Sequence, residues 1–97
     1  MRRKSKVDRN QPKIVSALRK AGCSVAVTST AGKGFPDIVV GLQGKNYMIE
    51  IKDGEAFPSD RKLNKRQKKF HSTWKGQIDV ALCVDDALEI VGLKSEN

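Results

Sequence analysis

The sequence is poor in the residues that build zinc sites and nucleophilic catalytic centres. Its 97 residues include two cysteines, one histidine and three prolines, and aromatic residues make up 5%. Cys23 and Cys83 lie in apolar runs without a CxxC partner or a neighbouring histidine, which argues against zinc and predicts two buried thiols. We expect the single histidine, His71, at the surface. No Ser/His/Asp or Cys/His pair is available, because one histidine would have to serve with thiols that lie in core strands.

Long apolar runs are also missing. No stretch of signal-peptide length follows Arg2, Arg3 and Lys4, and none approaches the length of a membrane span. We therefore expect an intracellular protein with no membrane contact. Hydrophobic residues at 38% and charged residues at 31% are typical of a globular chain. The length predicts a single domain over residues 1–97, with frayed ends at 1–7 and 94–97.

Acidic residues are few beside the basic ones. Eleven Asp and Glu face nineteen Lys and Arg, which leaves a net charge of +8 and a pI near 9.8. Such an excess is the electrostatic footprint of a protein that binds polyphosphate. A membrane-surface role would need a basic amphipathic helix with bulky apolar residues opposite the charges. The first helix that the sequence predicts, over residues 8–22, is only modestly basic.

The apolar pattern predicts an α/β sandwich with the element order αβββαβα. A helix is expected over residues 8–22, capped by Asp8 or Asn10 and ended by Gly22. Its inward stripe comprises Gln11, Ile14, Val15, Ala17, Leu18 and Ala21. Strands are expected over 23–28, 37–42, 45–53 and 78–84, a helix from the Asn64 cap to about Trp74, and a helix over 86–91 capped by Asp85.

The second and third strands are separated only by Gln43 and Gly44, which predicts a β-hairpin with a two-residue turn. That turn sets Ile38 against Ile49 and Val40 against Tyr47 on one apolar face. The opposite face then carries polar side chains. A slip of one residue in this register would send them to the other side.

On the polar face of the hairpin, Asp37 is expected opposite Glu50, with Lys52 at diagonal range. Two facing carboxylates suit Mg²⁺, and the backbone carbonyl of Ile51 could add a third ligand. Lys52 could steady an attacking hydroxide or a scissile phosphate, which is the chemistry of phosphodiester hydrolysis. The same residues on an arbitrary strand would form only a solvated face with a weak ion pair.

Further motifs strengthen the phosphodiesterase interpretation. The run Gly34-Phe35-Pro36-Asp37, then Glu50-Ile51-Lys52, then Gln67 on a basic helix resembles the PD-(D/E)XK nuclease superfamily. More narrowly it is similar to the VRR-NUC family, whose stand-alone members occur in phages and bacteria. The resemblance extends from residue 8 to about 91. It implies a restriction-endonuclease-like αβββαβ core with a mixed central sheet and a short C-terminal helix.

The resemblance also implies roles for individual residues. Mg²⁺ or Mn²⁺ would bind at Asp37 and Glu50, Lys52 would be catalytic, and Gln67 would support the site. Many members of the superfamily carry a glutamate on the first helix, where this chain has Gln11. An amide oxygen can accept a hydrogen bond from a metal-bound water but adds no charge, so the number of metals stays open.

The basic residues around the second long helix are expected to follow DNA phosphates rather than only to solvate a face. This predicted DNA-binding set comprises Lys33, Lys62, Lys65, Arg66 and Lys69. Phe70 and Trp74 are expected in the core or in a dimer contact rather than as base-stacking groups. Asp53 and Glu55 are expected to be exposed.

Taken with a similarity to archaeal Holliday junction resolvases, these features predict a structure-selective DNA endonuclease. It would cut four-way junctions as a homodimer whose two sites match a branched DNA. The compartment implied is the bacterial cytoplasm or a phage-infected host cell. The alternatives are a flap or restriction-like nuclease, a catalytically silent DNA-binding module, and a basic interaction domain for an acidic protein.

Overall fold

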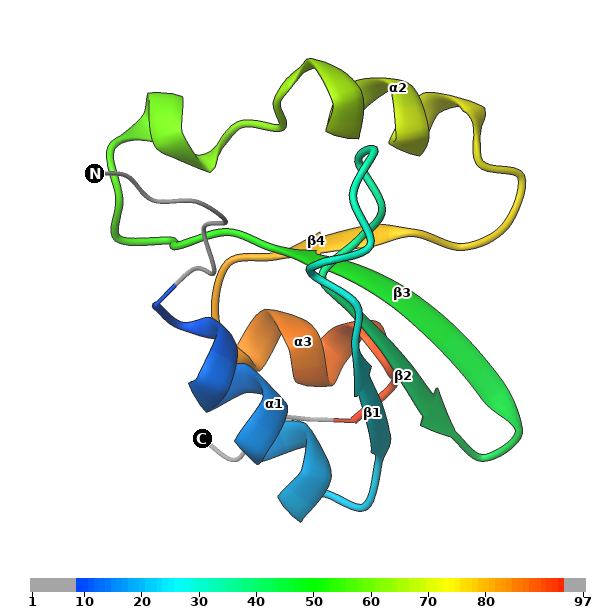
Figure 1. The fold of residues 1–97 in the computed structure, drawn as a ribbon. Helices are drawn as coiled ribbons and strands as arrows, with labels where there is room; N and C mark the ends of the chain where they lie inside the picture. The colour runs from blue at the N-terminus through cyan, green and yellow to red at the C-terminus, as the bar shows by residue number, and fades with distance from the viewer. Residues whose placement is uncertain (1–8, 94–97) are drawn as a thin grey trace.

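A computed structural model describes residues 9–93 (Figure 1). The elements follow the chain as α1 (Gln11–Lys20), β1 (Ser24–Val27), β2 (Ile38–Leu42), β3 (Lys45–Ile51), a 3₁₀ turn η1 (Pro58–Arg61), α2 (Lys65–Thr73), β4 (Asp79–Ala81) and α3 (Val84–Ile90). The predicted order αβββαβα is confirmed. The expected frayed ends, 1–7 and 94–97, and the proposed Asp8 cap lie outside the described residues. No helix within 9–93 combines the length and the apolar character needed to cross a membrane.

The four strands form one mixed sheet in the order β1-β2-β3-β4. β1, β2 and β3 are antiparallel neighbours, whereas β4 runs parallel to β3. Helices α1 and α3 lie together on one side of the sheet, and α2 lies on the other (Figure 1). The fold is therefore an α/β arrangement in which a short, twisted sheet separates the helices α1 and α3 on one face from α2 on the other.

The core lies between the sheet and the pair α1 and α3. It consists of Ile14, Val15, Leu18, Cys23, Ile38, Val40, Ile49, Ile51, Ala81, Ala87 and Val91. Alternate residues of β2 and β3 point into it, as the period of two along a strand requires. The strand residues between them lie on the opposite face of the sheet, where Glu50 contacts Gln67 of α2.

The hairpin of β2 and β3 has the predicted register. Ile38 pairs with Ile49 and Val40 with Tyr47. Gln43 and Gly44 form the turn with φ values of 53° and 81°, the two positive angles of a type I′ turn. The twist of this turn matches that of the strands, so it fixes the register on which the polar face depends.

Two caps differ from the sequence prediction. Asn10 stands at the start of α1, but its side chain accepts no capping hydrogen bond. Its amide instead donates to the carbonyls of Lys52 and Leu82, at 3.0 and 3.1 Å. The last strand ends at Ala81, and Asp85 is not the cap of α3 because the helix already begins at Val84.

The cysteines occupy different environments. Cys23 is buried, and burial raises the pKa of its thiol. Cys83 is exposed, so the prediction of a second buried thiol is wrong. The cause is the shortened last strand, because Cys83 falls at the extended residue before α3 rather than inside the sheet.

Candidate active site

Asp37 and Glu50 meet where β2 begins and β3 ends. Asp37 directly precedes β2, and its Oδ2 accepts a hydrogen bond from the backbone N–H of Ile51 at 2.8 Å. Glu50 lies on β3 with 2% of its surface exposed, on the strand face opposite the buried Ile49 and Ile51. The hairpin register thus brings two carboxylates together on the side of the sheet that α2 covers.

Gln67 connects this carboxylate pair to α2. Its Nε2 donates to Glu50 Oε2 at 2.8 Å. Its Oε1 accepts from the backbone N–H of Asn64, while Asn64 Oδ1 accepts from the N–H of Gln67, which completes a capping box. Since the cap uses the amide oxygen, the amide nitrogen is the group left to face Glu50. The start of α2 therefore fixes the orientation of a donor inside the site.

The loop over residues 29–35 presses against the same helix. Gly34 has a φ of 82°, and a Cβ there would overlap the backbone carbonyl of Arg66. Phe35 next to it makes an edge contact with Phe70, with ring centroids 5.4 Å apart. Only glycine allows this approach, so the loop before Asp37 and the first turns of α2 are packed backbone to backbone.

The base of the loop is held by β1. Thr28 donates its backbone N–H to the Asp37 carbonyl and its hydroxyl to the Pro36 carbonyl, both at 2.8 Å. The backbone bond extends the β1–β2 ladder by one residue, and the hydroxyl bond holds the next carbonyl. Asp37 consequently projects from a fixed strand end rather than from a free loop.

A cavity of about 680 Å³ opens between the loop, the strand ends and α2. Its lining brings together five residues that the sequence singled out, namely Asp37, Glu50, Ile51, Lys52 and Gln67. It also includes Lys33 and Arg66 from the predicted DNA-binding set, together with Asp60 and Asn64. The lining thus combines the carboxylates Asp37 and Glu50 at the strand ends with cations from the loop, the strand end and α2.

Other predicted residues lie elsewhere. Gln11, 5% exposed at the first turn of α1, lines a separate groove with Pro12 and Val15 rather than the cavity. Lys65 and Lys69 are exposed on α2, and Lys62 borders a different hollow beside Pro58. Gln11 and Lys62 therefore line other hollows and not the carboxylate cavity.

At three further positions the sequence analysis did not predict the surroundings that the structure shows. Asn10 fixes the backbone at Lys52 through its amide, although sequence alone marked it only as a cap. Asp60 reaches the cavity from η1, in a stretch that showed no periodic pattern. His71, expected at the surface, is half-buried, and no described residue forms a hydrogen bond with its Nε2.

Burial lowers the pKa of His71, the Lys52 charge lowers it further, and the Asp79 charge partly opposes both. Asp53, which follows Lys52, has a lowered pKa because its carboxylate accepts the Glu55 N–H and also pairs with Arg9 at 3.1 Å. Neither His71 nor Asp53 lines the carboxylate cavity.

The donor set of the cavity fits a hard divalent cation. Two carboxylates and a backbone carbonyl are oxygen ligands, and Mg²⁺ commonly takes one or two carboxylates while keeping several waters. Within residues 9–93 no group of three His, Cys, Asp or Glu side chains gathers around one point. A metal at this place would thus be held by Asp37 and Glu50 with backbone and water oxygens.

Comparison with protein-family models, with curated proteins and with solved structures gives no match for this chain.

Proposed function

We propose that the chain is a metal-dependent endonuclease of the PD-(D/E)XK type that hydrolyses DNA phosphodiester bonds. The observation that carries the proposal is the convergence of Asp37, Glu50 and Lys52 at the strand ends, in one cavity with the cations Lys33 and Arg66. The order of elements and the mixed sheet are compatible with a restriction-endonuclease-like core. The motif order that resembles the VRR-NUC family supports the narrower assignment.

In this proposal Asp37 and Glu50, with the Ile51 carbonyl, hold Mg²⁺ or Mn²⁺. When bound, the metal supplies Lewis acidity and a nucleophile at neutral pH. Lys52 places an ammonium beside the carboxylates, where it stabilises negative charge that grows on the scissile phosphate. Gln67 keeps the Glu50 carboxylate in one orientation through its 2.8 Å hydrogen bond.

Substrate binding is assigned to the basic side of the cavity. Lys33 and Arg66 stand next to the carboxylates, and Lys69 continues the positive charge along α2. Side chains of this kind bind phosphates and position a duplex without reading its sequence. We therefore propose selection by DNA structure, with four-way junctions cut by a homodimer whose two sites are related by a twofold axis.

The test is a cleavage assay on four-way junction, flap, splayed and duplex DNA with Mg²⁺ or Mn²⁺. Asp37→Ala and Glu50→Ala should each reduce cleavage by at least about 100-fold and leave metal-free DNA binding intact. Glu89→Ala, which removes an exposed acid from α3, is the matched control and should cleave normally. Unchanged cleavage by the Asp37 and Glu50 variants would show that the active site is assigned wrongly.

A second candidate is a DNA-binding module without catalysis. The observation that favours it is Gln11, because α1 contributes a neutral amide that lies outside the cavity. This candidate predicts that the unmodified chain binds branched DNA but cuts none of the four substrates with either metal. The cleavage assay therefore separates the two functions directly.

A further inference from the structure

A second hollow adjoins the candidate active site. It has a volume of about 410 Å³ and is lined by Lys33, Arg66, Lys69, Phe70 and Thr73. Lys33 and Arg66 line both this hollow and the carboxylate cavity. Two cations therefore stand between the hollow and the point where a phosphodiester would be cut.

The lining of the hollow defines the chemistry of its occupant. Three of its five residues are cations and none is acidic, so an anion is favoured. Phe70 adds an aromatic surface, and Thr73 adds a hydroxyl whose proton is already given to the Lys69 carbonyl at 2.8 Å. The hydroxyl oxygen is left as an acceptor. A ligand with negative charges, a flat ring and hydrogen-bond donors matches all of these groups.

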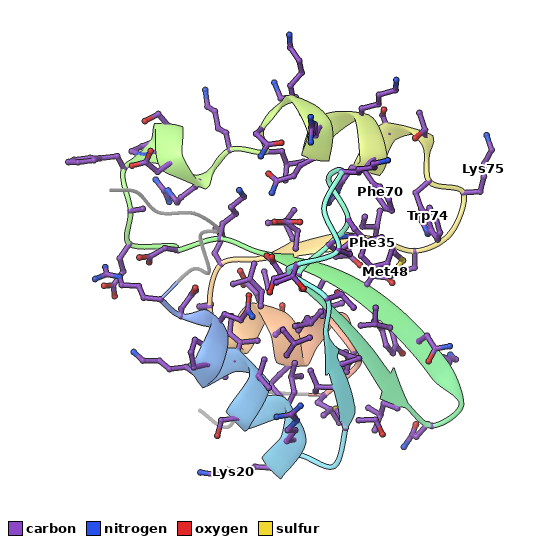
Figure 2. All side chains as sticks on the ribbon, in the orientation of Figure 1. Lys20, Phe35, Met48, Phe70, Trp74 and Lys75 are labelled. Atoms are coloured by element: carbon purple, nitrogen blue, oxygen red, sulfur yellow. The ribbon has the colours of Figure 1, made fainter. Side chains whose placement is uncertain are left out.

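The Phe70 ring is held in place before any ligand binds. It stacks on Trp74, with centroids 5.1 Å apart and planes inclined by 14°, and it meets Phe35 edge to face. Figure 2 shows these three aromatic side chains together below α2. A ring fixed by two neighbours loses little freedom when a base contacts the part of it that lines the hollow, so the ordering cost of binding is small.

Lys33 is held at the tip of its loop in an unusual conformation. Its φ is 57°, between Gly32 and Gly34 at 82° each. A left-handed conformation at a residue with a side chain costs about 1–2 kcal/mol, and such strain is concentrated at functional sites. The loop therefore maintains, at a cost in stability, a cation shared by the two cavities.

We propose that the second hollow is a subsite for one unpaired nucleotide of the DNA strand. Its base lies against Phe70, and its flanking phosphates are bound by Lys33, Arg66 and Lys69. This inference rests on the proposed nuclease function and specifies the substrate, because the bond cut is then the one next to an unpaired nucleotide. Flap and splayed DNA carry such a nucleotide, whereas a fully paired four-way junction supplies one only where a base at the branch point is extruded. Continuous duplex is disfavoured because a stacked base would first have to be extruded.

The first experiment compares a short oligothymidylate with an abasic strand of the same length, by fluorescence anisotropy of the full chain in EDTA. Both strands carry the same phosphates, so any difference reports the base. We expect the abasic strand to bind about tenfold more weakly, which is the loss of one base–aromatic contact. Equal affinities would overturn the subsite.

A pair of variants tests whether the difference in affinity between the two strands arises in the hollow. Thr73→Glu introduces a carboxylate among the lining residues and leaves all three aromatic rings in place, whereas Ser72→Glu adds the same charge to the neighbouring exposed position on α2. We expect the ratio of the two affinities to fall to nearly one in Thr73→Glu and to persist in Ser72→Glu. A ratio that persists in both variants contradicts the subsite.

Failure of the subsite and failure of the nuclease function have different signatures. Metal-dependent cleavage with equal binding of both strands would overturn the subsite alone. Base-dependent binding without cleavage of any DNA would overturn the nuclease function and leave a nucleotide-binding hollow. Phe70→Leu, compared with the exposed Phe57→Leu, should reproduce the loss of base dependence if the variant retains the native circular dichroism spectrum.

Discussion

Helices α1 and α3 contact the sheet through fully buried side chains, whereas α2 on the opposite face buries none (Figure 1). Ile14 and Leu18 of α1 lie in a dry core with Ile38 and Ile49. α2 is attached by the Gln67–Glu50 hydrogen bond, by the close approach of Gly34, and by three aromatic rings. Because apolar burial dominates folding free energy, α2 should open at a lower free energy than the whole domain unfolds.

This difference places the candidate site at the junction of a stable part and a weakly attached part. Asp37 and Glu50 belong to the sheet, and Gln67 and Arg66 belong to α2. The cavity therefore exists only while α2 is docked. A ligand that contacts both parts, such as a DNA strand, should stabilise the docked state by its binding free energy.

The largest effect is expected where the loop touches α2. Gly34→Ala and Gly32→Ala both place a Cβ at a φ of 82°, but only the first meets the Arg66 carbonyl, since nothing lies within 4 Å of the second. The shared backbone strain costs about 1 kcal/mol in each variant. Gly34→Ala should further weaken α2 docking by about 1–3 kcal/mol.

Hydrogen exchange of the backbone amides compares α2 docking in these two variants. Amides of α2 should exchange faster in Gly34→Ala than in Gly32→Ala, whereas amides of β3 should be alike in both. Equal exchange in α2 would mean that the loop contact does not hold the helix, and the contrast between the two faces would then lose its main support.

A smaller effect is expected at Gln67. Gln67→Glu retains an oxygen that can cap Asn64, so the capping box survives, but the donor toward Glu50 becomes a second carboxylate. Loss of the bond and repulsion between like charges should weaken docking by about 1–3 kcal/mol. The fluorescence of Trp74, the single tryptophan next to the end of α2, should move toward that of exposed indole while the far-ultraviolet circular dichroism is retained. An unchanged emission would show that this hydrogen bond contributes nothing to docking.

The attachment of α2 should also depend on pH through His71. Burial lowers the pKa of His71 in the folded chain, Lys52 lowers it further, and Asp79 opposes them. The unfolded state therefore binds the proton more readily, so the stabilisation is complete above about pH 6.5 and is lost as pH falls through the lower folded-state value. Trp74 emission should report a looser α2 in mild acid. His71→Gln should flatten that response, and a response that persists in the variant would exclude His71 as its origin.

Local sequence patterns predicted the hairpin register and the start of α2 better than they predicted contacts between distant segments. The register of β2 and β3 follows from alternation and a two-residue turn, and the Asn64 cap follows from a short motif, so both could be predicted. Contacts made across the fold could not. Asn10 contacts the backbone at Lys52 and Leu82, far along the chain, and no periodicity marks such a partner.

The candidate site shows the same division. Asp37 and Glu50 are brought together by hairpin register alone, which the sequence specifies. Asp60 reaches the cavity from the short turn η1, and Lys33 reaches it from a loop whose position depends on the Gly34 contact with α2. Gln11 was assigned to the site from resemblance to a family, yet it lines a different groove and not the carboxylate cavity.

The smallest predicted effect concerns the sheet, which is the stable part of the molecule. Gln43 has a φ of 53° at the first position of the hairpin turn, where asparagine is the preferred residue. Gln43→Asn should raise the free energy of global unfolding by about 0.5 kcal/mol, measured by denaturant titration. Exchange of α2 amides should not change, since the turn belongs to the sheet and α2 opens without it. If α2 protection instead rises by the same amount, the helix opens only when the whole domain unfolds, and the two faces form one cooperative unit.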